Sequence, residues 1–292
     1  MPHILDGKQV AQKLKDKLKI EIENIKAKFN RVPGLAVIQV GNVSASSVYV
    51  KAKTKAAKEV GISVIDHHLK ETTNQNDLIN LINQLNNNED VNGILVQLPL
   101  PKTINEEMVL NSILPEKDAD GFHPLNVGKL SISQKNDEGL MIPCTPYGCL
   151  LLLRELNINL AGKNAVVVGR SNIVGKPMAQ LLLKESCTVT TVHSKTINIE
   201  SICKKADILV AAIGKPELIN KDWVKEGAII IDVGINKIKI NDEKSKLVGD
   251  VLFSDVEHKV SAISPVPGGV GPMTIACLLR NTTTACKLKH SY

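Results

Sequence analysis

The stretch Ala165-Val-Val-Val-Gly-Arg-Ser-Asn-Ile-Val-Gly175 decides the fold class of this 292-residue chain. Its small apolar residues predict a short buried strand, the glycine after them a tight turn, and the residues from Gly175 to about Leu183 a helix. A strand, a glycine turn and a helix in this order are typical of dinucleotide-binding sites. The spacing departs from Gly-x-Gly-x-x-Gly because Arg170 occupies the place of the second glycine, so the motif alone is a weak signal.

The next strand, Thr188–Val192, ends in His193-Ser194 and lacks the acidic residue that holds the ribose hydroxyls of NAD. With Arg170 and Ser194 available and no carboxylate to repel it, a 2′-phosphate is tolerated, which favours NADP over NAD. His193 taken alone fits a strand-end histidine without a special role. Two further strands are expected at residues 208–212 and 228–233, and Asp232 and Asp250 are interpreted as structural carboxylates.

The same alternation occurs in the first half of the chain. Apolar runs at residues 35–40, 62–65 and 93–98 predict strands, and helices are expected between them. Asp6 and Gln9 form a capping-box start for a helix that runs to about Phe29. Strands that alternate with helices imply parallel sheets, and the chain length allows two domains. We therefore expect an α/β protein with two αβα domains, the C-terminal one of Rossmann type.

A candidate catalytic pair lies in Gly41–Lys53, which follows the first of these strands. Residues 45–60 predict a helix that Gly61 ends, and Tyr49 and Lys53, four residues apart, share one face of it. Ligands of parallel sheets bind beyond the carboxyl ends of the strands, where Gly41 and Gln97 also lie. The alternative is a solvated basic face formed by the lysines of this helix, Lys51, Lys53, Lys55 and Lys58.

The segments between these strands and helices also contain residues that predict turns and helix starts. Residues 115–121 form a turn-rich stretch in which Asp120, beside Gly121, is better placed for a ligand than Asp118. Thr103 and Glu106 are expected to cap a helix that runs to about Leu114. An irregular connection is expected at residues 128–139. Thr145 is predicted to be the N-cap of a buried helix with Pro146 at its first position.

Residues 265–274, Pro-Val-Pro-Gly-Gly-Val-Gly-Pro-Met-Thr, are unusually restrained. Their prolines stiffen the backbone, and their glycines allow it to approach a ligand closely. A final helix is expected from Met273 to about Leu288, and its N-terminus is a candidate site for an anionic group.

Composition excludes several classes of protein. Aromatic residues make up only 2% of the chain, which argues against nucleic-acid binding by base stacking. No run reaches the apolar length of a membrane span, and the first residues do not resemble a secretory leader. The six cysteines include no Cys-x-x-Cys pair and are expected to be buried thiols in a reducing cytoplasm. His67-His68 is interpreted as a surface pair, and no metal is expected.

Six of these stretches together resemble the methylenetetrahydrofolate dehydrogenase/methenyltetrahydrofolate cyclohydrolase family in its bifunctional bacterial form. The resemblance extends over nearly the whole chain. The stretches are Tyr49-Val-Lys-Ala-Lys53, Gly93-Ile-Leu-Val-Gln-Leu-Pro-Leu-Pro101, Lys117-Asp-Ala-Asp-Gly121, Pro143-Cys-Thr-Pro146, Gly169-Arg-Ser-Asn-Ile-Val-Gly175 and Pro267-Gly-Gly-Val-Gly-Pro-Met-Thr274.

The resemblance implies a folate-binding catalytic domain (residues 1–144 and 275–292), an NADP-binding Rossmann domain (residues 145–274), and a cleft between them. It implies that Lys53 is the general acid/base of the cyclohydrolase step, that Gln97 positions Lys53, that Tyr49 stacks on the folate and that Asp120 hydrogen-bonds the pterin. The other implied substrate-binding residues are Val96, Leu98, Pro265, Val266, Pro267 and Gly268. The implied cofactor-binding residues are Gly169, Arg170, Ser171, Ile173, Val174, His193, Ser194, Ile235 and Thr274.

The implied activity is oxidation of 5,10-methylenetetrahydrofolate with NADP, followed by hydrolysis of the methenyl product to 10-formyltetrahydrofolate. A cytoplasmic homodimer without nucleic-acid or membrane partners is implied as well. Two alternatives remain at this point: a dehydrogenase without cyclohydrolase activity, against which the presence of Lys53, Gln97 and Asp120 counts, and a non-enzymatic nucleotide-binding protein.

Overall fold

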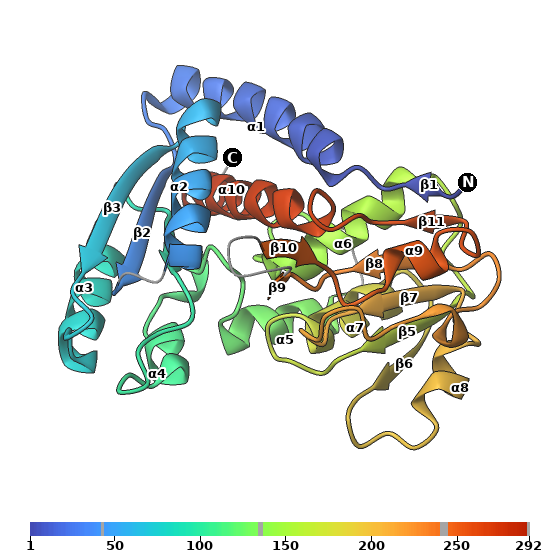
Figure 1. Ribbon diagram of the computed structural model, residues 1–292. Helices are drawn as coiled ribbons and strands as arrows, with labels where there is room; N and C mark the ends of the chain where they lie inside the picture. Colours follow the sequence, from blue (N-terminus) through green and yellow to red (C-terminus); the bar gives the residue numbers. More distant parts are fainter. Residues whose placement is uncertain (42–43, 134–136, 240–244, 291–292) are drawn as a thin grey trace. The chain divides into compact units, whose positions relative to one another are not determined.

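The computed structural model describes residues 1–41, 44–133, 137–239 and 245–290, with residues 44–48 described by their backbone only (Figure 1). The chain divides into two compact units. The six-strand unit consists of Met1–Ala11 and Thr145–Thr274, and the three-strand unit consists of Gln12–Cys144 and Ile275–Tyr292. Each unit contains a parallel sheet with helices, as the alternation of strand and helix patterns predicts.

The first eleven residues, which the sequence analysis assigned to the same domain as residues 12–144, lie in the compact unit of residues 145–274. β1 (His3–Ile4) pairs in parallel with β11 (Ala262–Ile263), so the start of the chain belongs to the six-strand unit. The backbone amide of His3 donates to the carbonyl of Ser261 at 2.8 Å. A strand of two residues carries too little alternation to be recognised in a sequence.

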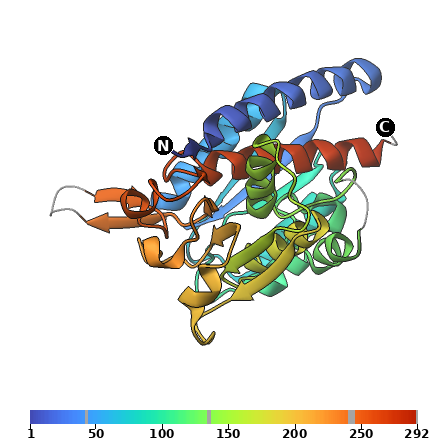
Figure 2. The same cartoon turned by 90° about the vertical axis from the view of Figure 1, so that its right-hand side faces the viewer.

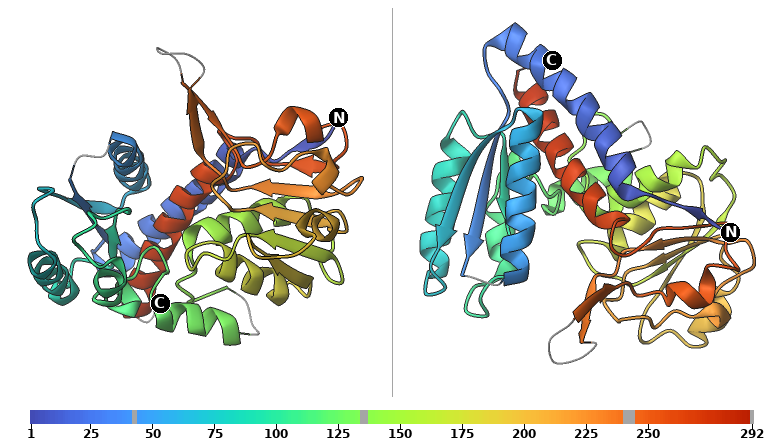
Figure 3. Two further views of the ribbon diagram at one scale, coloured as in Figure 1. Left: turned by 60° about the horizontal axis from the view of Figure 1, so that its bottom comes forward. Right: turned by 45° about the horizontal axis from the view of Figure 1, so that its top comes forward.

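The sheet of the three-strand unit has the order β3-β2-β4, with the central strand buried along its whole length. Ala36, Ile38 and Val40 of β2 pack in one cluster with Leu78 and Ile82 of α3. α2 contacts β2 and β3, and α2 and α3 lie on opposite sides of the sheet (Figure 3). The elements are β2 (Gly34–Val40), β3 (Ser63–Leu69), β4 (Gly93–Val96), α1 (Gly7–Phe29, whose first residues lie in the other unit), α2 (Ser44–Val60), α3 (Gln75–Asn87), α4 (Glu106–Asn111), the 3-10 turn η1 (Pro115–Lys117) and α5 (Pro124–Ile132).

The sheet of the six-strand unit has the order β1-β11-β8-β7-β5-β6, and its strands are parallel. From β5 the chain moves to β6 on one side and then to β7 on the other, which makes the β5/β7 junction a switch point where ligands of such sheets bind. Its elements are α6 (Cys144–Glu155), β5 (Asn164–Val168), α7 (Gly175–Lys184), β6 (Thr188–Val192), α8 (Ile199–Cys203), β7 (Ile208–Ala211), η2 (Lys221–Trp223), β8 (Ile229–Asp232), α9 (Phe253–Val256) and α10 (Val270–Lys289, which continues into the three-strand unit).

A two-stranded antiparallel hairpin, β9 (Asn236–Lys239) with β10 (Ser245–Val248), extends from the same unit (Figure 2). The carboxylates of Asp232 and Asp250 have the structural role that the sequence analysis assigned to them. The Asp232 carboxylate accepts from the backbone amides of Gly234, Asp250 and Val251, and Asp250 accepts from those of residues 213–215. Burial raises the pKa of Asp232 to about 7.

Helix starts are where the sequence predictions fail most often. α4 is capped by Asn105, whose side chain accepts from the Met108 amide, and Thr103 is not the cap. α6 begins at Cys144, so Thr145 lies inside the helix. α10 begins at Val270, three residues before the expected start. α5 occupies the first part of the expected connection at residues 128–139, of which residues 134–136 lie outside the described chain.

The six cysteines are buried and free, as expected. Among the described residues, no helix combines the length and apolar composition that crossing a bilayer requires.

Candidate active site

Lys53 lies on the buried face of α2, where its neighbours Val50, Ala57 and Val60 recur at helical spacing. Only 6% of Lys53 is exposed, whereas Lys51, Lys55 and Lys58 of the same helix are exposed. The solvated basic face is therefore correct for these three lysines and wrong for Lys53. A lysine in this position needs a polar partner, because burying an isolated ammonium group is costly.

Gln97 supplies that partner. Its Oε1 accepts a hydrogen bond from Lys53 Nζ at 3.1 Å. Gln97 follows β4, and its backbone amide donates to the carbonyl of Ile38 on β2 at 2.9 Å. Its own Nε2 donates to the Leu98 carbonyl at 2.8 Å, which turns the amide so that Oε1 faces the lysine. The sheet and this local bond together fix the orientation of Gln97.

Asp120 completes the group in the three-strand unit. Burial raises its pKa to about 6, while the nearby charge of Lys53 lowers it and that of Asp118 raises it further. A carboxyl group with this pKa changes protonation close to neutral pH, which is typical of functional sites. The structure thus brings together Lys53, Gln97 and Asp120.

Asp118 has a different task from Asp120. Its carboxylate accepts from the backbone amides of Gly121 at 3.1 Å and His123 at 2.8 Å, and from Asn126 Nδ2 at 3.0 Å. These bonds close the turn after η1, in which Gly121 adopts a φ of +76° that other residues rarely adopt. Sequence analysis did not single out Asn126, because no local pattern links it to a turn eight residues earlier.

Tyr49 lies one turn before Lys53 on α2 and is half-buried. Burial raises the pKa of its phenol, so the ring stays neutral at physiological pH. Val96 is the buried last residue of β4, and Leu98 is half-buried. Val96 and Leu98 pack with the apolar cluster that includes Leu78 and Ile82 of α3.

The expected cofactor residues lie in the six-strand unit at the carboxyl ends of neighbouring strands. Gly169–Ser171 follow β5, His193 and Ser194 follow β6, and Ile235 follows β8. Val168 pairs with Val192, and the Gly169 amide donates to the Val192 carbonyl at 2.9 Å, so the first two groups are adjacent.

The glycine turn after β5 fits a group that needs close backbone approach. Gly169 has a φ of +130°, and a Cβ there would lie 2.2 Å from the Ala212 carbonyl oxygen. A Cβ on Gly175 would lie 2.4 Å from the Gly169 carbonyl oxygen. Both glycines are required by the packing of the turn on the sheet. Arg170 and Ser194 are exposed beside it, and no carboxylate occupies residues 193–194.

Ser171 holds the turn that leads into α7. Its Oγ accepts from the backbone amides of Val174 and Gly175, both at 3.2 Å. Ile173 is 40% exposed and Val174 is half-buried. Since the first amides of α7 already have a partner, a nucleotide phosphate cannot rely on them alone as it does in a Gly-x-Gly-x-x-Gly turn.

Other residues that were expected to contact cofactor or substrate form hydrogen bonds within the six-strand unit. His193 Nδ1 accepts from the Lys195 amide at 3.2 Å. Thr274 Oγ1 lies 3.0 Å from Thr145 Oγ1 and 3.3 Å from the Val270 carbonyl oxygen. The Pro265–Gly268 segment turns immediately before α10, where the Gly269 amide donates to the Pro265 carbonyl at 2.8 Å. This segment belongs to the six-strand unit, whereas Lys53, Gln97 and Asp120 belong to the three-strand unit.

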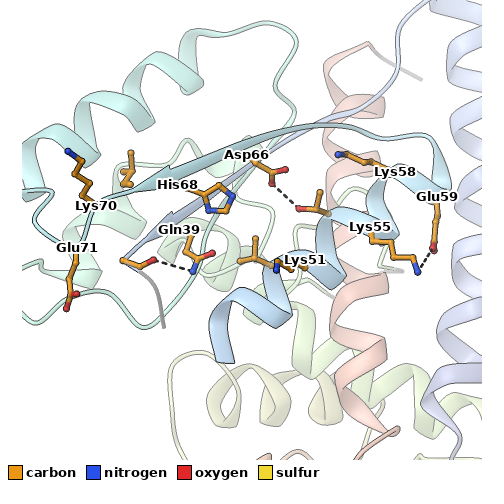
Figure 4. Close-up of a pocket in the computed structure, with 13 residues that line it drawn as sticks. Gln39, Lys51, Lys55, Lys58, Glu59, Asp66, His68, Lys70 and Glu71 are labelled. Atoms are coloured by element: carbon orange, nitrogen blue, oxygen red, sulfur yellow. Dashed lines mark hydrogen bonds and ion pairs between the residues drawn. The ribbon is translucent and has the colours of Figure 1, made fainter. Parts of the chain in front are cut away.

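A separate groove of about 1110 Å³ lies between α2 and β3 (Figure 4). Its lining includes the exposed Lys51, Lys55, Asp66 and His68, and Thr54 Oγ1 donates to Asp66 at 3.0 Å. None of Lys53, Gln97 and Asp120 lines it. Its position beside an edge strand distinguishes it from the polar group at the strand ends.

Comparison with known proteins identifies the family of this chain. Residues 5–120 match the family model of the tetrahydrofolate dehydrogenase/cyclohydrolase catalytic domain, and residues 143–290 match the model of the NAD(P)-binding domain of the same family. The chain is 51% identical to the "Bifunctional protein FolD" of Rhodospirillum rubrum, with 98% of each chain covered. It is 55% identical to that of Acetivibrio thermocellus, with 98% of this chain and 97% of the relative covered.

Solved structures give the same result. The bifunctional methylenetetrahydrofolate dehydrogenase/cyclohydrolase of Campylobacter jejuni is 47% identical and superposes with a TM-score of 0.92 over 99% of this chain and 100% of that one. The Trypanosoma brucei enzyme, solved in complex with NADP and an inhibitor, is 38% identical with a TM-score of 0.94 over 100% of this chain and 99% of that one. The chain therefore belongs to the tetrahydrofolate dehydrogenase/cyclohydrolase family.

Proposed function

We propose that this bifunctional enzyme oxidises 5,10-methylenetetrahydrofolate with NADP and then hydrolyses the methenyl product to 10-formyltetrahydrofolate, with Lys53 as the acid/base residue of the second step. The observation that carries the assignment of Lys53 is its burial on α2 with Nζ 3.1 Å from Gln97 Oε1 and the Asp120 carboxyl close enough to interact. The bifunctional relatives argue against the alternative of a dehydrogenase alone.

The first step needs alignment more than proton transfer. NADP, when bound, supplies the acceptor for the hydride of the methylene carbon. The residues proposed to hold it are those at the ends of β5, β6 and β8: Gly169, Arg170, Ser171, Ile173, Val174, His193, Ser194, Ile235 and Thr274. The proposed substrate residues are Tyr49, Val96, Leu98 and Pro265–Gly268, which bind the folate so that its reactive carbon is held in place.

The second step needs a base and then an acid. Water adds to the methenyl carbon, and the Lys53 amine takes the proton that this water loses. The bond from N5 of the pterin to that carbon then breaks, and Lys53 returns the proton to N5. The hydroxyl on the carbon releases its own proton to solvent as it becomes the carbonyl of the formyl group on N10. Gln97 keeps Nζ directed at the reacting atoms through its oriented amide. Asp120 binds the pterin, and Tyr49 stacks on it.

The preference for NADP over NAD is supported by two features of the turn regions. Arg170 and Ser194 are exposed at the carboxyl ends of the adjacent strands β5 and β6, where a 2′-phosphate would meet a cation and a hydroxyl. Paired steady-state assays with NADP and NAD check this, and an equal or higher kcat/KM with NAD would contradict it.

We also propose that the enzyme is a cytoplasmic homodimer that has no nucleic-acid or membrane partner. β3 forms the edge of its sheet, and Ile65 on it is 36% exposed. Unpaired edges of this kind are sites of association. Sedimentation velocity at micromolar concentration should give the mass of a dimer, and a monomer mass would remove this proposal.

The catalytic assignment is tested by Lys53→Met, which keeps the length of the side chain and removes its amine. Hydrolysis of methenyltetrahydrofolate is expected to fall by about 10²- to 10⁴-fold, because the only proposed proton carrier is lost. Binding of NADP should be unchanged. Lys55→Met, which removes an exposed amine from the same helix, is the matched control. A cyclohydrolase rate in Lys53→Met equal to that of the control would show that another group moves the proton.

A further inference from the structure

The backbone on both sides of Asp120 is held by residues far away in the sequence. The Asp120 carbonyl accepts from the Cys144 amide at 3.2 Å, and the Ala119 amide donates to the Ile94 carbonyl at 3.3 Å. The Ala119 carbonyl accepts from Cys144 Sγ at 3.3 Å. The main chain at Asp120 is therefore fixed between β4 and the segment that leads into α6.

Asn281 of α10 adds the strongest of these restraints. Its Nδ2 donates to the Ala119 carbonyl at 2.9 Å and to the Ile142 carbonyl at 2.8 Å. One amide group therefore bridges the two segments that lie on either side of the Asp120 turn. Asn281 is fully buried, and its Oδ1 accepts from Arg280 Nη1 at 3.1 Å, which fixes the orientation of the amide.

The next two residues of α10 provide a comparison. Thr282 and Thr283 are as buried as Asn281, but their hydroxyls donate to carbonyls of their own helix, Leu278 at 3.0 Å and Leu279 at 2.9 Å. A buried amide costs free energy unless its hydrogen bonds are made, and Asn281 makes all of its bonds outside the helical ladder. Helix formation does not require this side chain, whereas the bridge between residues 119 and 142 does.

We propose that Asn281 is a positioning residue for the cyclohydrolase step, which holds the Asp120 carboxyl against the Lys53 amine by tying the Ala119 and Ile142 carbonyls together. The proposal rests on the roles proposed above for Asp120 and Lys53. A displacement of about 1 Å in a reacting group can reduce a rate about 100-fold, so a restraint one residue away from Asp120 matters for catalysis.

The test uses Asn281→Asp, which keeps the shape of the side chain and removes both donated hydrogen bonds, and Asn281→Ser, which retains a single donor. Thr283→Val is the matched control because it removes a buried hydroxyl of the same helix that bonds only to that helix. For each full-length variant, the cyclohydrolase kcat/KM is measured from pH 5 to pH 8, together with the melting temperature. We call the fall in rate at low pH, where Asp120 gains its proton near pH 6, the acid limb of the profile. Asp120→Asn serves as the reference for it, because this variant has no carboxyl group at residue 120.

In Asn281→Asp we expect kcat/KM to fall by about 10- to 100-fold. The acid limb is read from Asn281→Ser, because the new carboxyl group of Asn281→Asp would itself raise the pKa of Asp120. In Asn281→Ser we expect a smaller loss of rate and an acid limb moved about one unit toward the ordinary pKa of a carboxyl group, because a loosened turn admits water. Asn281→Ser therefore also decides the question if Asn281→Asp does not fold. Thr283→Val should leave both quantities unchanged. An unshifted acid limb in Asn281→Ser, with a rate within twofold of Thr283→Val, would overturn the inference. Persistence of the limb in Asp120→Asn would instead refute the role proposed for Asp120.

Discussion

Two lysines of the three-strand unit are almost equally buried, but their ammonium groups differ in the number of hydrogen bonds that they make. Lys117 in η1 is 8% exposed, and its Nζ donates to three carbonyls, those of Leu85 at 3.0 Å, Asn86 at 2.7 Å and Asn88 at 2.7 Å. Lys53 is 6% exposed, and within the described chain one hydrogen-bond partner of its Nζ is found, Gln97. An ammonium group has three donors. Lys117 uses all of them to hold the end of α3, while Lys53 uses one of them within the described residues.

The comparison teaches that the burial of a lysine does not by itself indicate function. Burial lowers the pKa of Lys117, yet its ammonium group already donates to three main-chain carbonyls. Lys117 completes the carboxyl end of α3, where main-chain carbonyls lack helical partners and a cation is favourable. What distinguishes Lys53 is that a single hydrogen bond of its amine is found in the part of the chain that the structure describes, beside a carboxyl group of raised pKa.

Removing each amine should separate the two roles. Lys117→Met leaves three carbonyls without their donor, and we expect the free energy of unfolding to fall by about 2–4 kcal/mol. Lys53→Met should leave stability unchanged or slightly increased, because a buried amine with few partners is replaced by an apolar chain. Urea titration measures both, with the exposed Lys102→Met as control. The distinction fails if Lys53→Met destabilises the protein as much as Lys117→Met does.

The partner of Lys53 gives a smaller effect. Gln97→Leu keeps the approximate volume of the side chain and removes the oxygen that orients Nζ, so the cyclohydrolase rate should fall by about 10- to 100-fold with the melting temperature little changed. The exposed Gln12→Leu is the control. If the rate of Gln97→Leu falls by less than twofold, the hydrogen bond from Gln97 is not needed to orient the Lys53 amine.

The smallest expected change is in the free energy of unfolding of Asp120→Asn, and it depends on pH. Because the pKa of Asp120 is raised to about 6 in the folded chain, the native state binds a proton more tightly than the unfolded state between about pH 4 and pH 6. The stabilisation this gives is complete below about pH 4 and is lost as the pH rises through 6. Asp120→Asn cannot ionise, so relative to the parent chain it should gain about 1–2 kcal/mol of stability between pH 4 and pH 7. A constant difference over that range would contradict the raised pKa.

The sequence predicts the larger part of the fold and less of the site. Periodicity is strong in β2, α2 and β5, where buried residues recur over several turns or strand positions, and these elements lie where expected. It fails for β1, whose two residues gain their conformation from β11, and for the helix starts, which depend on which nearby side chain reaches a free amide. Short elements take their structure from distant partners.

Within the site, Tyr49 and Lys53 could be paired from their spacing, but spacing could not show that Lys53 is buried while Lys51 and Lys55 are exposed. Asp118 and Asp120 have nearly the same local sequence, and they differ because Asn126 and two amides bind the first carboxylate. Asn281 lies more than a hundred residues from the carbonyls it holds, so no local pattern could reveal it.

The pairing of β1 with β11 has a consequence for synthesis on the ribosome. The first strand leaves the ribosome about 260 residues before its partner at Ala262–Ile263 exists, and the three-strand unit likewise lacks residues 275–292 until the chain ends. Folding of either unit therefore has to wait for a segment that is made much later than its first residues, unlike the N-terminal-first folding of contiguous domains during translation. A gene divided at residue 144 would separate Asn281 from Ala119 and β1 from β11, and co-expression of the two halves would have to restore both sets of bonds between separate chains.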